Sequence, residues 1–323
     1  MTPPLQLCRW ADVRAEYSEY VSPAVNRAFP ATVHLVWESG DGIHLGNRRF
    51  AVRLSTQPGL ENARAWDGLA QNFLDLSDLE LGRRYYWQVT ETRRGRVSAV
   101  SPLGWFETHP QPPRWLSAHG IANLRDAGGW AAGADKRVRQ GRVYRSVELN
   151  NHFRLPRPAR SYLLEDLKIR TDLDLRGPDE KPGPALDPRR VGYVNAPVDA
   201  YENITLDWSR QGFRLAFETL ARPENYPVLV HCWGGADRTG SLIFMLNGLL
   251  GVAPDDLFHD YELTSLSGVG RRLATSPSFQ EMLAVLRGFA PAGAPLVNQI
   301  EGYLAAIGVT PAQIETLRAE LLE

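Results

Sequence analysis

Residues 228–246 read VLVHCWGGADRTGSLIFML. An apolar, β-branched run ends just before Cys232, two glycines follow, and a second apolar run begins after Arg238. This order predicts a buried strand, a glycine turn and a helix that begins near Asp237. At such a turn the backbone N–H groups point into one concavity, and the positive end of the helix dipole faces it. The stretch therefore predicts an anion-binding cradle.

The thiol of Cys232 lies at the bottom of the predicted cradle, and Arg238 follows six positions later. Gly234 and Gly235 allow the backbone to approach an oxyanion without a Cβ in the way. The planar guanidinium of arginine binds two phosphate oxygens at once. Cysteines beside helix N-termini and cations have pKa values of roughly 3.5–7.5. We therefore expect a thiolate that attacks the phosphorus of a bound phosphate ester.

The overall composition excludes several other classes of protein. The 36 Lys and Arg residues nearly balance the 37 Asp and Glu residues, which leaves a net charge of −1. Bulk charge therefore does not indicate a nucleic-acid partner. The two cysteines, Cys8 and Cys232, are far apart, and no Cys/His cluster has the spacing of zinc ligands. We expect neither a disulfide framework, nor a metal site, nor a cofactor.

The start of the chain, MTPPLQLCRWADVRAE, has neither a basic n-region nor an apolar h-region, which predicts no signal peptide. The most apolar stretch, residues 242–252, is interrupted by Asn247 and is too short to span a bilayer. We therefore expect a cytoplasmic protein without a membrane span, although a secreted chain without its leader would begin in the same way.

The first third of the chain predicts an all-β domain. Short runs rich in β-branched and aromatic residues are separated by turns that contain Gly or Pro, which is typical of a β-sandwich. The predicted strands cover residues 32–37, 50–54, 85–90 and 103–107. A stiff proline-rich break at residues 109–113 then separates a smaller sandwich domain, 1–112, from a second domain, 113–323.

Beyond this break, strands alternate with helices, which predicts an α/β domain with a central sheet flanked by helices. The strands are expected at residues 141–146, 169–176, 191–197 and 228–230. The helices are expected at residues 161–167, 207–221, 237–250, 254–266, 277–289, 296–307 and 311–322. Pro254 and Pro311 stand near predicted helix starts, where the missing N–H costs little.

Residues 231–240, HCWGGADRTG, resemble the signature loop of the cysteine-based protein tyrosine phosphatase superfamily. Further blocks resemble its atypical bacterial and fungal tyrosine/dual-specificity branch, and the resemblance covers roughly residues 113–266. These blocks are Asn123–Gly129 (NLRDAGG), Tyr144–Ser146 (YRS), Asp174–Arg176 (DLR) and Asp260–Thr264 (DYELT). In the first domain, residues 81–89, LGRRYYWQV, resemble the late strands of fibronectin type III-like modules.

The superfamily resemblance implies a role for most residues of the loop. Cys232 is implied to be the nucleophile that becomes phosphocysteine, and Arg238 to bind the phosphoryl oxygens and the transition state. Thr239 is implied to stabilise the leaving thiolate, and His231 to position the loop by hydrogen bonding. The phosphate-binding residues are then Trp233, Gly234, Gly235, Ala236, Asp237 and Arg238.

The leaving oxygen needs a proton, so an acid must lie over the site. By resemblance to most of the superfamily the acid is Asp199, on a loop after an earlier strand. By resemblance to some members of the atypical branch it is Asp237, directly before the signature arginine. Both assignments stay open at this point. Many relatives carry a lysine in place of Ala236 that is associated with highly phosphorylated substrates, so its absence argues against a polyphosphorylated inositol.

We therefore predict a metal-independent phosphatase that hydrolyses phosphotyrosine, or a broader dual-specificity set of phosphomonoesters, through a phosphocysteine. One alternative is a phosphoinositide or inositol phosphate phosphatase of the same fold, and another is a catalytically dead module that binds phospho-ligands. The expected partners are phosphorylated proteins or small phosphomonoesters. The β-sandwich is expected to contact a partner or the catalytic domain. Structural roles in ordering the loop are expected for Arg125, Asp126, Asp174 and Arg176.

Overall fold

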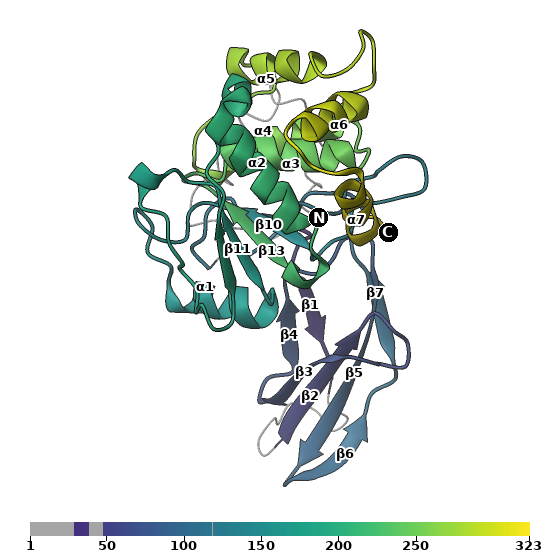
Figure 1. Ribbon diagram of the computed structural model, residues 1–323. Helices are drawn as coiled ribbons and strands as arrows, with labels where there is room; N and C mark the ends of the chain where they lie inside the picture. Colours follow the sequence, from purple (N-terminus) through teal and green to yellow (C-terminus); the bar gives the residue numbers. More distant parts are fainter. Residues whose placement is uncertain (1–28, 39–47, 118) are drawn as a thin grey trace. The chain divides into compact units, whose positions relative to one another are not determined.

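The structure is a computed structural model that describes residues 29–38, 48–117 and 119–323 (Figure 1). The described chain forms two compact units, one that ends at Arg114 and one that runs from Trp115 to the C-terminus. This division lies directly after the proline-rich break at residues 109–113. Cys8 and the rest of the start of the chain lie outside the described residues.

The first unit is built from antiparallel strands in two groups. In one group, β1 (Val33–Val36) pairs with β4 (Phe73–Leu76). The other group has the strand order β3-β2-β5-β6, and β7 also pairs with β5. Its strands are β2 (Arg48–Ser55), β3 (Arg64–Leu69), β5 (Arg84–Arg93), β6 (Arg96–Val100) and β7 (Gly104–Glu107).

One hydrophobic cluster joins these two groups of strands. Leu35 of β1 and Leu76 of β4 share it with residues of β2, and all of them are buried. The β2 residues Phe50, Val52 and Leu54 are spaced by two, so they lie on one face of the strand. The strands suggest an all-β unit, and its sandwich form and fibronectin type III-like character stay predictions.

Strands β3, β4 and β6 were not predicted from the sequence. All five residues of β6 are exposed, so this strand has no buried face that would produce an alternation of apolar and polar residues. No residue of β3 is buried either. Both strands pair with a longer neighbour, β5 or β2, because backbone hydrogen bonds do not require a particular pattern of side chains.

Apart from Arg114, the first residue of β8, the second unit contains a sheet with the strand order β12-β11-β13-β10-β9-β8. The neighbours β12, β11, β13 and β10 are parallel, and β9 is antiparallel to β10. Every residue of β10, β11 and β13 is buried, as expected for parallel strands covered on both faces. The strands are β8 (Arg114–Trp115), β9 (Arg125–Asp126), β10 (Val143–Ser146), β11 (Thr171–Asp174), β12 (Gly192–Asn195) and β13 (Val228–His231).

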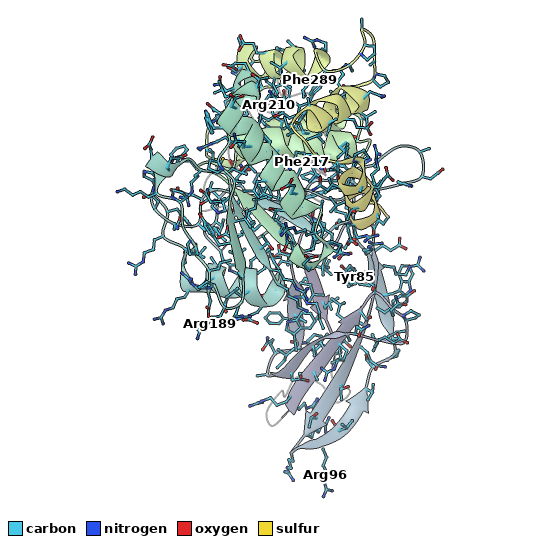
Figure 2. All side chains as sticks on the ribbon, in the orientation of Figure 1. Tyr85, Arg96, Arg189, Arg210, Phe217 and Phe289 are labelled. Atoms are coloured by element: carbon cyan, nitrogen blue, oxygen red, sulfur yellow. The ribbon has the colours of Figure 1, made fainter. Side chains whose placement is uncertain are left out.

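Helices cover this sheet, and Figure 1 shows α1 apart from the group formed by α2 to α6. They are α1 (Arg157–Ser161), α2 (Asp207–Leu220), α3 (Asp237–Leu249), α4 (Pro254–Leu263), α5 (Pro277–Arg287), α6 (Leu296–Ala306) and α7 (Pro311–Leu321). Side chains such as Phe217 of α2 are fully buried, whereas Arg189 extends away from the ribbon with its side chain 88% exposed (Figure 2). Within the described ranges, no helix has both the length and the apolar character needed to cross a membrane.

Short 3₁₀ and π turns complete the second unit. The helix expected at residues 161–167 begins earlier, at Arg157, because Pro156 and Pro158 stand where a helix start needs no N–H donor. It then widens into a π-helix. The short elements are the π-helix Tyr162–Asp166 and the 3₁₀ turns Pro178–Glu180, Tyr201–Thr205, Pro223–Asn225 and Thr264–Ser267.

The register of the parallel strands decides where the site forms. His231, the last residue of β13, aligns with Ser146 at the end of β10 and with Asp174 at the end of β11. The carboxyl ends of three strands therefore meet at one edge of the sheet. The segments that follow, including Cys232 and Arg176, must emerge side by side there.

Candidate active site

The loop between β13 and α3 is shaped by two glycines. Gly235 has a φ of +59°, and a Cβ on it would lie 2.1 Å from the carbonyl oxygen of Ser146. A Cβ on Gly234 would lie 2.6 Å from a methyl group of Val269. Both contacts are closer than real Cβ atoms allow, so the loop packs this tightly only with glycine at both positions. Cys232 begins the loop with only 2% of its surface exposed.

Side chains from two other segments hold the carbonyl groups of this loop. The Nδ2 of Asn123 donates to the carbonyl oxygens of Gly234 and Gly235, at 3.2 and 2.9 Å. The Nη2 of Arg145 also donates to the oxygen of Gly235, at 2.8 Å. Because C=O and N–H point in opposite directions across a trans peptide, the next N–H groups face away from Asn123 and Arg145. They are free to bind an anion on the other side of the loop.

Asp260 of α4 clamps two buried arginines beneath the loop. Its Oδ1 accepts from Nε of Arg125 at 3.0 Å, and its Oδ2 accepts from Nη1 of Arg145 at 2.7 Å. Burial would raise the pKa of Asp260, but the two arginines outweigh burial and lower it. Burial and the charge of Arg145 lower the pKa of Arg125 to about 10. Three blocks that are far apart in the sequence thus form one ionic support for the loop.

Carboxylates at the end of β11 hold the imidazole ring of His231. Its Nε2 lies 2.8 Å from Oδ1 of Asp172, and its Nδ1 lies 3.8 Å from Oδ1 of Asp174. Burial would lower the pKa of His231, but the charge of Asp172 outweighs burial and raises it. Among the described residues, Nδ1 of His231 has no hydrogen-bond partner. The imidazole is therefore fixed at one nitrogen, directly before Cys232.

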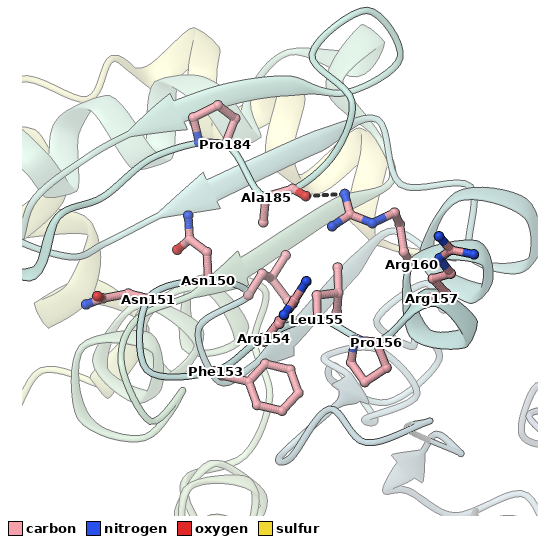
Figure 3. Close-up of a pocket in the computed structure, with 11 residues that line it drawn as sticks. Asn150, Asn151, Phe153, Arg154, Leu155, Pro156, Arg157, Arg160, Pro184 and Ala185 are labelled. Atoms are coloured by element: carbon pink, nitrogen blue, oxygen red, sulfur yellow. Dashed lines mark hydrogen bonds between the residues drawn. The ribbon is translucent and has the colours of Figure 1, made fainter.

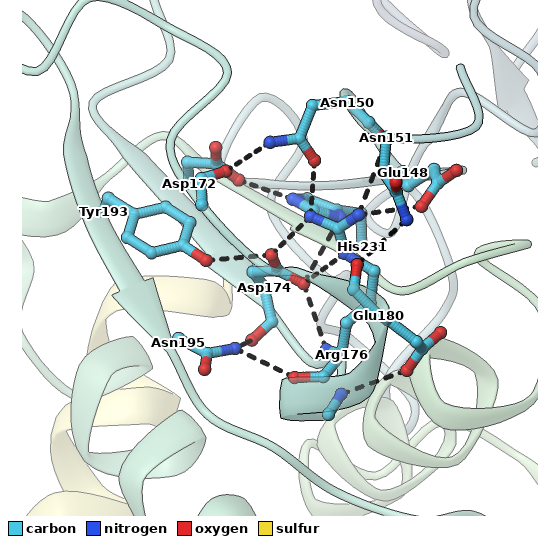
Figure 4. A network of polar contacts seen from close by, with 12 residues as sticks. Glu148, Asn150, Asn151, Asp172, Asp174, Arg176, Glu180, Tyr193, Asn195 and His231 are labelled. Atoms are coloured by element: carbon cyan, nitrogen blue, oxygen red, sulfur yellow. Dashed lines mark hydrogen bonds and ion pairs between the residues drawn. The ribbon is translucent and has the colours of Figure 1, made fainter.

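A second ionic group surrounds the segment that follows β11 (Figure 4). The guanidinium of Arg176 donates to both carboxylate oxygens of Asp174, at 2.9 and 2.7 Å, and to Oε2 of Glu148 at 2.7 Å. It also donates to Oδ1 of Asn150 at 2.5 Å. The hydroxyl of Tyr193 donates to Asp174 at 2.9 Å. All of the charged members are fully or almost fully buried, and their mutual hydrogen bonds order the segment.

The guanidinium of Arg238 is occupied by a carboxylate. Both of its terminal nitrogens contact Glu180, the Nη2 at 2.8 Å from Oε1. The two side chains are 20% and 26% exposed. Burial would lower the pKa of Arg238, but the hydrogen bond with Glu180 and the charge of that carboxylate outweigh burial and raise it. Arg238 is therefore a permanent cation close to the thiol, and it already binds an anionic group.

The two acid candidates lie in different surroundings. The carboxylate of Asp237 accepts hydrogen bonds from Nε and Nη2 of Arg272, at 2.5 and 2.8 Å, and from the hydroxyl of Tyr201. Burial would raise the pKa of Asp237, but the hydrogen bonds from Arg272 and Tyr201 lower it. Within the described ranges, the carboxylate of Asp199 accepts only from the N–H of Ala200, at 2.8 Å, and from Nδ2 of Asn203, at 3.2 Å.

Three further residues of the signature loop have the following surroundings. Thr239 is fully buried, and within the described part of the chain its hydroxyl has no hydrogen-bond partner. Trp233 is 51% exposed, and its ring lies edge-on to that of His152, with 6.4 Å between centroids. Ala236 is buried and precedes α3. The structure thus places Trp233 at the surface.

Sequence reasoning missed Glu180, Arg272 and Tyr201. None of them belongs to a block that carries the resemblance, and each reaches the loop from a different segment. The one available signal was local, because Glu180 follows the DLR block by four positions. No group of three or more His, Cys, Asp or Glu side chains in the described ranges is arranged to hold a metal ion.

A family model described as the tyrosine phosphatase family matches residues 116–323. The chain belongs to this family. It is also similar to a protein of Cupriavidus necator named "Putative tyrosine-protein phosphatase", with 32% identity over 185 residues. That alignment covers 47% of this chain and 66% of the relative, so it spans less than two thirds of the relative's length.

Two solved structures are also similar to this chain. One is the core catalytic domain of the PP-IP phosphatase SIW14 from S. cerevisiae in complex with citrate, at 20% identity and a TM-score of 0.34. The matched region covers 44% of this chain and 78% of the solved chain. The other is a Siw14 catalytic core, at 19% identity and a TM-score of 0.34, over 50% of this chain and 88% of that chain.

Proposed function

We propose that this chain is a protein tyrosine phosphatase, with dual specificity included, that hydrolyses phosphomonoesters through a phosphocysteine on Cys232. One observation carries the proposal. The thiol of Cys232 and the guanidinium of Arg238 belong to one tight loop, and Asn123 and Arg145 hold the carbonyl groups of that loop on the far side. The loop N–H groups are then free to stabilise the charge of a transferring phosphoryl group, and Arg238 joins them once the phosphate has displaced Glu180.

In the first step, the thiolate of Cys232 attacks phosphorus, so an S–P bond forms as the bond from phosphorus to the leaving oxygen breaks. An acid donates a proton to that oxygen, and the dephosphorylated alcohol leaves. In the second step, water attacks phosphorus, the S–P bond breaks, and the carboxylate that donated the proton accepts one from water. The products are inorganic phosphate and the free thiolate. The hydroxyl of Thr239 would stabilise that thiolate.

Asp199 is the acid in this proposal. Arg272 and Tyr201 lower the pKa of Asp237 and hold it as a carboxylate, so near neutral pH it does not carry the proton that a general acid must donate. Asp199 forms no ion pair with a cation among the described residues. Its carboxylate is nevertheless near enough to Arg238 to contribute to the raised pKa of that guanidinium. Asp237 then has a structural role, because its ion pair with Arg272 positions the segment of Arg272 beside the loop.

The first unit is proposed to be an accessory fibronectin type III-like module that contacts a partner. Its strands carry none of the blocks that surround Cys232. We propose a cytoplasmic location for the whole chain. The inositol phosphate alternative receives no support from the loop itself, because Arg238 is the single basic side chain among residues 232–238.

The proposal is tested by hydrolysis of p-nitrophenyl phosphate and of a phosphotyrosine peptide, with Cys232→Ser as the matched control. We expect the wild type to release phosphate and the serine variant to be at least about a thousandfold slower, because it lacks the thiolate. Acid quenching should trap a radiolabelled phosphoryl group on the wild type alone. A wild type no faster than Cys232→Ser that still binds the peptide would establish the dead binding module instead.

A further inference from the structure

A pocket of about 780 Å³ opens beside the segment that follows β10. Three arginines line it, Arg154, Arg157 and Arg160, and no acidic side chain does. Figure 3 shows the three arginine side chains in the pocket wall, with Ala185 of a second segment opposite Arg160. We call this cavity the arginine pocket.

The arginines of this pocket are largely free to bind a ligand. In the described part of the chain, Arg154 and Arg157 have neither an ion pair nor a side-chain hydrogen bond. Arg160 uses one nitrogen, Nη1, to donate to the carbonyl oxygen of Ala185 at 2.5 Å. Most arginines near the catalytic loop are neutralised by carboxylates, as Arg176 and Arg238 are. The arginine pocket therefore has uncompensated positive charge.

The same segment also touches the catalytic loop. Asn151, at the rim of the pocket, donates from Nδ2 to the carbonyl oxygen of Glu180 at 3.0 Å. The next residue, His152, lies edge-on to the exposed ring of Trp233. Arg154 follows two positions later. A substrate bound at Cys232 that extends past Trp233 would therefore run along this segment toward Arg154 on the same molecule.

The lining decides the class of ligand. Phe153, Leu155 and Pro184 place apolar surface beside the guanidinium groups. Guanidinium groups bind phosphate bidentately, and an apolar wall favours a ligand whose charge stands at the end of an apolar or aromatic stem. A phosphotyrosine side chain has this form. The ring of an inositol phosphate carries charge on every side and gains little from the apolar wall.

We propose that the arginine pocket binds a second phosphotyrosine side chain of the same peptide whose first phosphotyrosine is hydrolysed at Cys232. This inference rests on the proposed function, and it adds a preference for doubly phosphorylated sequences. It also explains why the catalytic loop needs only one basic side chain. Arg154 and Arg157 neutralise the charge of the second phosphate, so no basic residue is required in place of Ala236.

The test compares peptides that differ at one position. Each peptide carries a phosphotyrosine, and a second tyrosine two to five residues away is either phosphorylated or not. The first dephosphorylation step is measured as kcat/KM for the wild type and for the double variant Arg154→Gln/Arg157→Gln. The matched control is Arg222→Gln, which removes an exposed arginine ahead of the start of β13, at the end of the strand opposite to Cys232.

We expect the wild type and Arg222→Gln to prefer the doubly phosphorylated peptide by about tenfold in kcat/KM, mainly through KM. The double variant should lose this preference and keep the rate for the singly phosphorylated peptide. An equal preference in all three proteins would overturn the proposal. So would a double variant that changes only the hydrolysis of inositol polyphosphates, since the pocket would then serve another class of substrate.

Failure of the proposed function gives a different result. If the wild type hydrolyses no phosphomonoester, the pocket is tested by calorimetric titration of Cys232→Ser, with and without the Arg154→Gln/Arg157→Gln changes, against the two peptides. A second phosphate that strengthens binding only when both arginines are present supports the pocket alone. Equal binding of the two peptides rejects it.

Discussion

Glu180 forms an ion pair with Arg238 through both of its carboxylate oxygens. The guanidinium group binds this carboxylate through two nitrogens, which is also how arginine binds a phosphate. The hydrogen bond from Arg238 lowers the pKa of Glu180, although burial opposes it, so the carboxylate stays ionised. A substrate phosphate that uses Arg238 must therefore displace Glu180 from it.

Glu180→Gln is expected to strengthen inhibition by inorganic phosphate. Because the neutral amide competes less well for Arg238, the inhibition constant should fall, by up to about fivefold for an ion pair of this partial exposure. The matched control is Glu165→Gln, which breaks the exposed pair between Glu165 and Arg190. Weaker phosphate inhibition in Glu180→Gln would show instead that Glu180 orients Arg238 for binding.

Asp199→Asn and Asp237→Asn separate the two acid candidates. Removal of the acid should lower kcat by about 10²–10⁴-fold for a substrate with a poor leaving group and abolish the alkaline limb of the pH–rate profile. We expect this for Asp199→Asn. Asp237→Asn should keep the alkaline limb and lose thermal stability, because Arg272 loses its ionic partner. The reverse pair of profiles would assign the acid to Asp237.

Gly235→Ala is expected to abolish phosphatase activity, because its Cβ would meet the carbonyl oxygen of Ser146. Gly133→Ala is the matched control, since Gly133 also has a positive φ, +76°, but a Cβ there meets nothing within 4 Å. The control should lose about 1–2 kcal/mol of unfolding free energy and keep its activity. Chemical denaturation measures the change in unfolding free energy, and steady-state kinetics measure the change in kcat. Equal losses in the two variants would refute the role of the close approach.

Asp260→Asn should reduce the free energy of unfolding by about 3–5 kcal/mol, because it leaves Arg125 and Arg145 buried without their counter-ion. Asp255→Asn, on the exposed start of the same helix, should cost less than about 1 kcal/mol. The pKa of Asp260 is lowered from its ordinary 3.8. Its stabilisation is therefore present above pH 3.8 and is lost as the pH falls through the folded-state pKa.

The acid-induced unfolding curve measures that contribution. The wild type should lose stability steeply below pH 3.8, and Asp260→Asn should show a flatter dependence in the same range. An unchanged slope in Asp260→Asn would mean that the two arginines are neutralised by another group.

Thr239→Ala is expected to slow the breakdown of the proposed phosphocysteine, because the buried hydroxyl has no partner among the described residues and can donate to the departing thiolate. A hydrogen bond to a charged group corresponds to roughly 10–100-fold in rate. Rapid mixing should then show a burst of the first product, with kcat reduced more than kcat/KM. Ser241→Ala is the control, since Ser241 also has a buried hydroxyl without a partner within the described residues. A burst in both variants would contradict the assignment.

Much of the second unit could be predicted from local pattern. The run from Val228 to Leu246 contains a strand, a glycine turn and a helix in the order in which they occur, and the expected helices near the C-terminus lie within a few residues of α5, α6 and α7. Periodicity and turn chemistry act between neighbours in the chain, so they are readable there. Exposed strands such as β6 leave no such signal.

The sequence by itself determined the local structure of the loop, because the strand, the two glycines and the start of the helix lie within about ten residues of one another. Only the tertiary structure decided what surrounds that loop. Asn123, Arg145 and Glu180 reach it from segments that the sheet register and helix packing bring together. Such contacts depend on three-dimensional distance between residues up to 139 positions apart, and no local spacing encodes them.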